Sequence, residues 1–143
     1  MKVLHVCPYY VPAIEWGGPV RSVPALIGAV TGEGVEVEVV TTTTRGSRSL
    51  PRPPAGRRPV DDHVVSYAHS IGPRRYFFSR DLARTLARDT GAFQVVHLHG
   101  LWTYPVLAAA STCRRLGVPY IVAPRGTLDP WALSQKTLKK RIY

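Results

Sequence analysis

The chain has 143 residues, of which 45% are hydrophobic, a size and composition that suit one globular domain with a single core and exclude wholesale disorder. No apolar run approaches the ~18 residues that a membrane span requires, and Met1-Lys2 leads directly into a strand pattern, so we expect a protein that is neither exported nor membrane-spanning. The 19 basic against nine acidic side chains give a net charge of +10, which predicts an anionic partner: a phosphate ligand, an anionic lipid surface or nucleic acid.

The two cysteines bear on the cellular compartment. Cys7 and Cys113 lie far apart and lack Cys-x-x-Cys spacing, so they predict neither a metal knuckle nor a redox pair. Reduced thiols are typical of the cytoplasm, and we therefore expect a cytoplasmic protein. Because the chain is positively charged, a peripheral position at the inner face of the membrane is the alternative to a free cytoplasmic protein.

Strand and helix patterns alternate from the amino terminus. Residues 3–6 predict a strand, and residues 35–40, where valines alternate with glutamates, predict a second. Between them the apolar positions follow one helical face and glycines supply the stop: Val20, Val23, Leu26, Ile27 and Val30, then Gly32 and Gly34. Pro24 fits this helix only if it begins near Ser22 or is kinked, so we expect a late start or a kink.

Regular patterning fails between Thr41 and Val60. The segment is rich in Thr, Ser, Gly, Pro and Arg and contains no carboxylate. Its prolines deny it helical or inner-strand hydrogen bonds, so we expect a flexible surface loop over about residues 43–60. Two interpretations of its arginines remain open: a solvated loop, or contact with an anionic surface or ligand.

Further βα units follow the loop. Residues 62–67 predict a third strand, placed at an edge of the sheet, and Ser79 predicts the cap of a helix that buries Leu82 and Leu86 and ends near Gly91. A strand through residues 95–99 comes next, followed by an Ala-rich helix over 104–116, closed by a glycine, and a strand over 119–124.

The last predicted element is a helix capped by Asp129, with Pro130 at its first position. Its pattern continues to Tyr143 without a Gly or Pro stop, so we expect one half of a larger protein. Repeated βα units require right-handed crossovers and a mostly parallel sheet with helices on both faces, which defines the α/β class.

Ligands bind such sheets at the carboxyl ends of the strands. Two loops are expected there: Trp16-Gly17-Gly18-Pro19 and His99-Gly100-Leu101-Trp102. Gly17 and Gly18 have no Cβ atoms, so a phosphate could approach their backbone closely at the start of the next helix. A tight turn that binds no ligand explains these glycines equally well. The first strand is followed by no G-x-G-x-x-G, no Walker lysine loop and no carboxylate pair, which excludes NAD, P-loop and phospho-receiver functions.

The histidine pair at the end of the fourth predicted strand is the second candidate feature. His97 and His99 point to the same face of the sheet, and we expect His97 to be interior and His99 to lie outside the core, where it can bond a sugar hydroxyl. A metal site is not expected, because no third ligand accompanies the pair. Trp16, Trp102 and Trp131 flank the loops as sugar platforms or as core residues.

Four segments together resemble the N-terminal domain of family-4-type retaining glycosyltransferases. They are Met1-Lys2-Val3-Leu4-His5-Val6, Trp16-Gly17-Gly18-Pro19-Val20-Arg21, Val95-Val96-His97-Leu98-His99-Gly100-Leu101-Trp102 and Ala123-Pro124-Arg125-Gly126-Thr127-Leu128-Asp129-Pro130-Trp131-Ala132-Leu133. The resemblance implies the acceptor-side, Rossmann-like half of a GT-B architecture. It places Gly17 and Gly18 at the donor diphosphate and the catalytic His99 at the transferred sugar. The cleft or acceptor residues would be Trp16, Arg21, Trp102, Arg125 and Gly126.

The same resemblance implies transfer with retention from a nucleotide-sugar donor to a glycan or lipid-linked acceptor, without a metal cofactor. Family members carry a characteristic pair of glutamates in a C-terminal donor-binding domain. None of Glu15, Glu33, Glu36 and Glu38 has that spacing, so this domain is absent from residues 1–143 and we expect the chain to be inactive alone.

The alternative is a non-catalytic module that binds an anionic or membrane surface. It would use the arginine loop and a second basic cluster formed by Lys136, Lys139, Lys140 and Arg141. No nucleic-acid partner is expected, because neither a recognised motif nor an aromatic-basic sheet face accompanies the charge.

Overall fold

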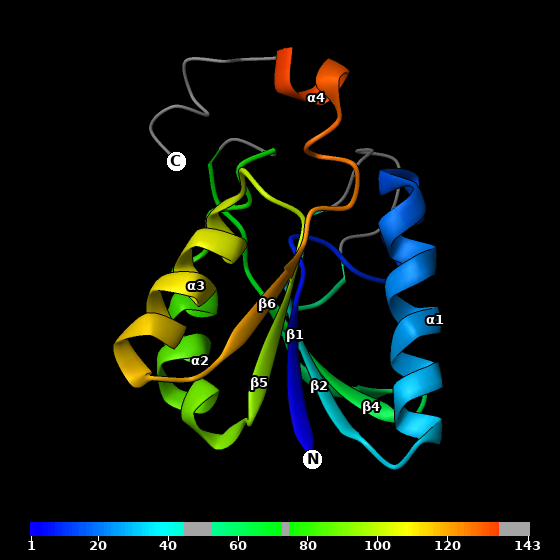
Figure 1. Cartoon of the computed structure of the whole chain (residues 1–143), viewed down its shortest axis with the longest axis vertical. Helices are drawn as coiled ribbons and strands as arrows, with labels where there is room; N and C mark the ends of the chain where they lie inside the picture. Colours follow the sequence, from blue (N-terminus) through cyan, green and yellow to red (C-terminus); the bar gives the residue numbers. More distant parts are fainter. Residues whose placement is uncertain (45–52, 73–74, 135–143) are drawn as a thin grey trace.

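A computed structural model describes residues 1–44, 53–72 and 75–134. These residues form one six-stranded sheet with helices on both faces (Figure 1), which confirms the predicted α/β class. The strands are β1 (Lys2–Val6), β2 (Glu36–Thr42), β3 (Gly56–Val60), β4 (His63–Ala68), β5 (Val95–His99) and β6 (Tyr120–Ala123). The helices are α1 (Gly18–Gly32), α2 (Arg80–Asp89), α3 (Tyr104–Leu116) and α4 (Pro130–Ser134), with short 3-10 turns η1 (Ile14–Trp16) and η2 (Thr90–Ala92).

The strand order is β3-β4-β2-β1-β5-β6, and every neighbouring pair is parallel except β3 with β4. The chain therefore builds outward from β1 through β2 in one direction and later from β1 through β5 in the other. Such a reversal leaves a crevice between the two strands at their carboxyl ends, where ligands of doubly wound sheets bind. The topology thus selects the space above β1 and β5.

The sheet has a core on each face. On one face α2 and α3 pack against Leu4, Val6, Val96 and Leu98, and on the other α1 packs through Val23 and Ile27 against side chains of β2 and β4 (Figure 1). Side chains alternate along a strand. Because Leu4, Val6, Val96 and Leu98 face α2 and α3, the histidines of β1 and β5 face α1.

Three expectations about the first half of the chain need correction. Helix α1 begins at Gly18 and not near Ser22, because Pro19 in its first turn supplies the helical φ, so Pro24 lies inside the helix. Residues 56–60 of the predicted loop form β3, an edge strand, where a proline is tolerated. Strand β4 consequently lies between β2 and β3 and is not an edge strand.

Local signals in the second half are confirmed. The Ser79 hydroxyl accepts a hydrogen bond of 3.1 Å from the backbone N–H of Leu82 and so caps α2. Gly117 ends α3 in the left-handed conformation, with φ of 69°. Helix α4 begins at Pro130 as predicted, whereas its predicted continuation over 135–143 and the loop residues 45–52 lie outside the described residues. Within the described ranges, no helix is both long and apolar enough to cross a membrane.

Candidate functional site

A pocket opens at the carboxyl ends of β1, β5 and β6. Its volume is about 70 Å³, smaller than a complete small-ligand site, so the described residues form one part of such a site. Its lining comes from the loop after β1, the first turns of α1, the loop after β5 and the turn after β6: Cys7, Pro8, Tyr9, Pro19, Val23, His99, Gly100, Leu101, Thr103, Arg125 and Thr127. The two loops that the sequence places at one rim therefore do meet there.

The diglycine turn stands at the edge of this pocket. Gly17 has φ of 85°, which favours glycine, and both Gly17 and Gly18 are exposed, with no atom within 4 Å of where a Cβ would lie. The next residue, Pro19, lines the pocket. The start of α1, which carries the partial positive charge of a helix amino terminus, therefore lies beside the pocket.

His99 lines the pocket but is nearly enclosed. Only 2% of its surface is exposed, whereas His97 is half-buried, so the expectation that His99 lies outside the core and His97 inside it is wrong. The carboxyl end of β5 is covered by α1 and by the turn after β6, which the strand pattern alone does not reveal. Arg125 from that turn reaches Nδ1 of His99 through Nε and Nη2, at 3.3 and 3.2 Å.

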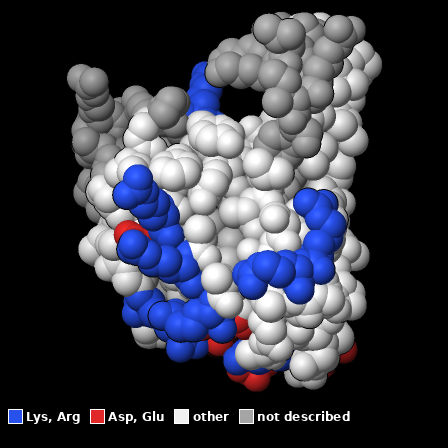
Figure 2. Space-filling model, turned by 90° about the vertical axis from the view of Figure 1, so that its left-hand side faces the viewer, with Lys and Arg blue, Asp and Glu red and all other residues white. Residues whose placement is uncertain are grey.

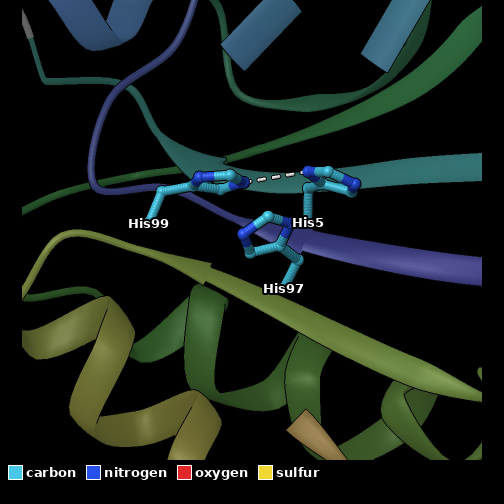
Figure 3. Close-up of side chains that lie close together, drawn as sticks. All are labelled: His5, His97 and His99. Carbon is cyan, nitrogen blue, oxygen red and sulfur yellow. Dashed lines mark hydrogen bonds between the residues drawn. The ribbon is translucent and has the colours of Figure 1, made fainter. Parts of the chain in front are cut away.

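A second histidine completes the arrangement. Nε2 of His99 lies 2.9 Å from Nδ1 of His5, which comes from the neighbouring strand β1, and Figure 3 shows the two rings joined by this hydrogen bond with His97 beside them. No role for His5 was expected from the sequence. The missed signal is the strand register, in which His5 is opposite His97.

Both bonded imidazoles are neutral in the physiological range. Burial, followed by the positive charges that His97, His5 and Arg125 can carry, lowers the pKa of His99 to about 2. Burial likewise lowers the pKa of His5 to about 3, with His97, His63 and Arg125 acting in the same direction. Neither ring is suited to act as an acid at neutral pH, since the charged form is strongly disfavoured.

Arg125 connects three elements at the pocket. It follows β6 in a turn closed by a 3.1 Å hydrogen bond from Thr127 N–H to the Pro124 carbonyl. Both central residues have positive φ, 53° for Arg125 and 77° for Gly126, as in a type I′ turn. A non-glycine residue in this region is strained, a condition concentrated at functional sites. The guanidinium also donates from Nη1 to Oγ of Ser22 in α1, at 3.3 Å, a contact that the sequence did not indicate.

The other predicted cleft residues lie around the pocket without lining it. Trp16 stacks on Tyr9, with ring centroids 5.1 Å apart, and its Nε1 is buried without a hydrogen-bond partner among the described residues. Trp102 donates from Nε1 to the Thr127 carbonyl at 3.2 Å and so ties the β5 and β6 loops together. Arg21 and Gly126 are exposed, and Trp131 is 77% exposed on α4.

The three histidines also raise the question of a metal. The strand pattern alone offers only two candidate ligands, but the structure adds His5, and one nitrogen from each ring lies within 4.8 Å of the others. The premise that a third ligand is missing is therefore wrong. Three neutral imidazoles fit a zinc ion in principle. In the hydrogen-bonded arrangement described above, however, both nitrogens of His99 are already engaged, and the Arg125 cation opposes a second positive charge.

Cys7 lies in the pocket wall, where it has a structural role. It is 2% exposed, and burial raises the pKa of its thiol to about 12. A thiol is a poor nucleophile until it ionises. Covalent catalysis through Cys7 is therefore not supported, and both cysteines are free thiols.

A doubly wound α/β domain with a pocket at its switch point is the class of protein that this geometry defines. The family model for the Glycosyl transferase 4-like domain matches residues 17–143, and the chain belongs to that family. Its general function is accordingly that of a glycosyltransferase domain. A comparison with curated proteins gave no match.

Proposed function

We propose that the chain forms the N-terminal, acceptor-side half of a retaining glycosyltransferase of GT-B architecture. It would contribute to the transfer of a sugar from a nucleotide-sugar donor to a glycan or lipid-linked acceptor in the cytoplasm. The observation that carries the proposal is the convergence of the α1 amino terminus, His99 and Arg125 on one pocket. A helix end and a guanidinium together suit a diphosphate.

In this proposal the diphosphate lies across Gly17 and Gly18, where the backbone allows close approach, and contacts Arg125, which reaches Ser22 of the same helix from the turn after β6. As the bond from the anomeric carbon to the leaving oxygen breaks, negative charge grows on the nucleoside diphosphate. Fixed positive groups stabilise that charge without reorganisation, and such stabilisation dominates the rate enhancement of many enzymes. His99 lies at the transferred sugar, where it holds Arg125, and no metal is required.

A second domain completes the proposed enzyme. The described residues supply one pocket wall but offer no site assigned to the nucleoside base or ribose. We propose that a C-terminal domain provides this site and the remaining diphosphate contacts. Residues 1–143 alone would then have no transferase activity.

Calorimetric titration of the chain with UDP, GDP and the matching nucleosides tests the proposal. We expect a diphosphate to bind more tightly than its nucleoside, and Arg125→Gln to weaken this binding about tenfold, the loss of one charge-assisted hydrogen bond. Arg84→Gln is the matched control, because Arg84 is an exposed residue of α2 and does not line the pocket. Equal affinity for nucleoside and diphosphate, or equal effects of the two variants, would contradict the proposal.

A specific observation also favours the second candidate function, binding to an anionic membrane surface. Figure 2 shows Lys and Arg side chains gathered on the face formed by α2 and α3. Exposed arginines recur every fourth residue along α2 and close α3: Arg80, Arg84, Arg88, Arg114 and Arg115. Asp81 and Asp89 pair with two of them. Sedimentation with anionic vesicles tests this function. If the arginines of α2 and α3 bind the membrane surface, vesicle binding by the native chain should fall as the salt concentration rises, and an Arg80→Gln/Arg114→Gln variant should bind less at low salt.

A further inference from the structure

The hydrogen bonds around His99 have a direction. Arg125, from the turn after β6, contacts Nδ1, and His5, from the neighbouring strand β1, contacts Nε2. Arginine carries N–H donors and no acceptor. Nδ1 of His99 must therefore be the unprotonated nitrogen, because a proton there would face the N–H groups of Arg125.

The rest of the proton arrangement follows from this one constraint. A neutral imidazole has one N–H, so the proton of His99 is on Nε2. It donates across 2.9 Å to Nδ1 of His5, which in turn carries its own proton on Nε2. The order of donation is Arg125 to His99 to His5, and reversing any bond would place two donors face to face.

We propose that His5 is a positioning residue that holds His99 as its Nε2–H tautomer, so that the unprotonated Nδ1 of His99 anchors the guanidinium of Arg125 at the pocket and His99 presents no proton donor to a ligand. This inference rests on the proposed function for its ligand. The lone pair of Nδ1 is taken by Arg125, so the group that meets the ligand is the anchored guanidinium, which carries N–H donors and a positive charge and suits the donor diphosphate. His99 holds Arg125 in place and does not protonate the leaving group.

The surroundings of the pair support the same state. His97 contacts both rings, with centroids 5.0 Å from His5 and 4.1 Å from His99, and Arg125 contributes a permanent positive charge. A further proton in this cluster would add charge beside charge. Metal coordination through Nε2 of His99 would require the opposite tautomer, with its Nδ1 proton against Arg125, so the proposed state and a metal at Nε2 exclude each other.

The tautomer is measurable without a ligand. Long-range 1H–15N spectra of the 15N-histidine-labelled chain distinguish a pyridine-type from a pyrrole-type nitrogen, and the five histidines can be assigned by single substitutions. We expect a pyridine-type Nδ1 and a pyrrole-type Nε2 for His99 at neutral pH. A protonated Nδ1, or an imidazolium, overturns the proposal.

Two substitutions of His5 separate positioning from packing. In His5→Asn the amide oxygen lies near the former Nδ1 and still accepts from His99, whereas His5→Leu fills space but removes the acceptor. We expect the Nε2–H tautomer to persist in the His5→Asn variant and to become mixed in the His5→Leu variant. His97→Asn is the matched control and should leave the tautomer of His99 unchanged. A mixed tautomer in the His5→Asn variant as well would count against the relay.

Binding of UDP-glucose and GDP-mannose then links the relay to function. If either donor binds, His5→Leu should weaken it about tenfold, and His5→Asn should restore most of the affinity. Equal affinity in all three proteins contradicts the positioning role. If neither donor nor any diphosphate binds the native chain while the tautomer is as expected, the proposed function fails and the proton arrangement stands.

Discussion

Acidification should destabilise this fold through its buried histidines. His5 and His99 have pKa values of about 3 and about 2 in the folded chain, against an ordinary value of 6.5. Below pH 6.5 these two histidines bind protons in the unfolded chain but not in the folded chain, so the free energy of unfolding falls as the pH falls. Between pH ~7 and pH ~5 each ring should lower the free energy of unfolding by about 2 kcal/mol, and the two together by about 4 kcal/mol. His63 and His97 have lowered pKa values too and act in the same direction.

Urea unfolding followed by circular dichroism across this pH range measures the effect. His5→Asn removes one titrating ring, so its loss of stability between the two pH values should be about 2 kcal/mol smaller than that of the native chain. His69→Asn is the control, because His69 is exposed after β4, and it should keep the native difference. A native stability that does not change with pH, or a His5→Asn variant with the native slope, would refute the reasoning.

Three further outcomes are expected. His99→Gln keeps a hydrogen-bond donor toward His5 but loses the acceptor toward Arg125. When a domain that binds the nucleotide-sugar is supplied, the rate of sugar transfer should therefore fall about a hundredfold. Undiminished turnover in a folded variant would contradict the role of His99. Ser79→Ala should lower the free energy of unfolding by about 1 kcal/mol through loss of the α2 cap, which urea titration against Ser134→Ala can check. Adding zinc or EDTA should leave the melting temperature unchanged, and a zinc-dependent rise would indicate a site at the three histidines.

Most secondary structure was predictable because its signals are local. The Ser79 cap, the Gly117 stop and the apolar alternation of β5 each depend on residues within one or two turns of the chain. The parallel arrangement follows from repeated βα units. The errors lie where strand pairing overrides composition. Strand β3 pairs with β4 despite its arginines and its proline, because proline has no N–H to donate and an edge strand does not need that donor.

The candidate site was predictable only in its location. Pro19, directly after the diglycine turn, lines one pocket together with His99, which agrees with the rule for carboxyl ends of parallel strands. The bond between His5 and His99 joins positions 94 residues apart and depends on the register of β1 against β5, which no local pattern carries. Burial of His99 likewise depends on Arg125, whose side chain is aimed by a turn with two positive φ values.

The amino-terminal segment belongs to the site as much as the matched family segment does. Residues 17–143 contain His99 and Arg125, but His5 and all of β1 precede them. Strand β1 is hydrogen-bonded to both β2 and β5, so it joins the two halves of the sheet. A chain that starts at Gly17 would expose the inner edges of two strands and leave the Nε2 proton of His99 without its acceptor. We expect such a truncated chain to lose cooperative unfolding in urea, and a cooperative transition with native stability would show that β1 is dispensable.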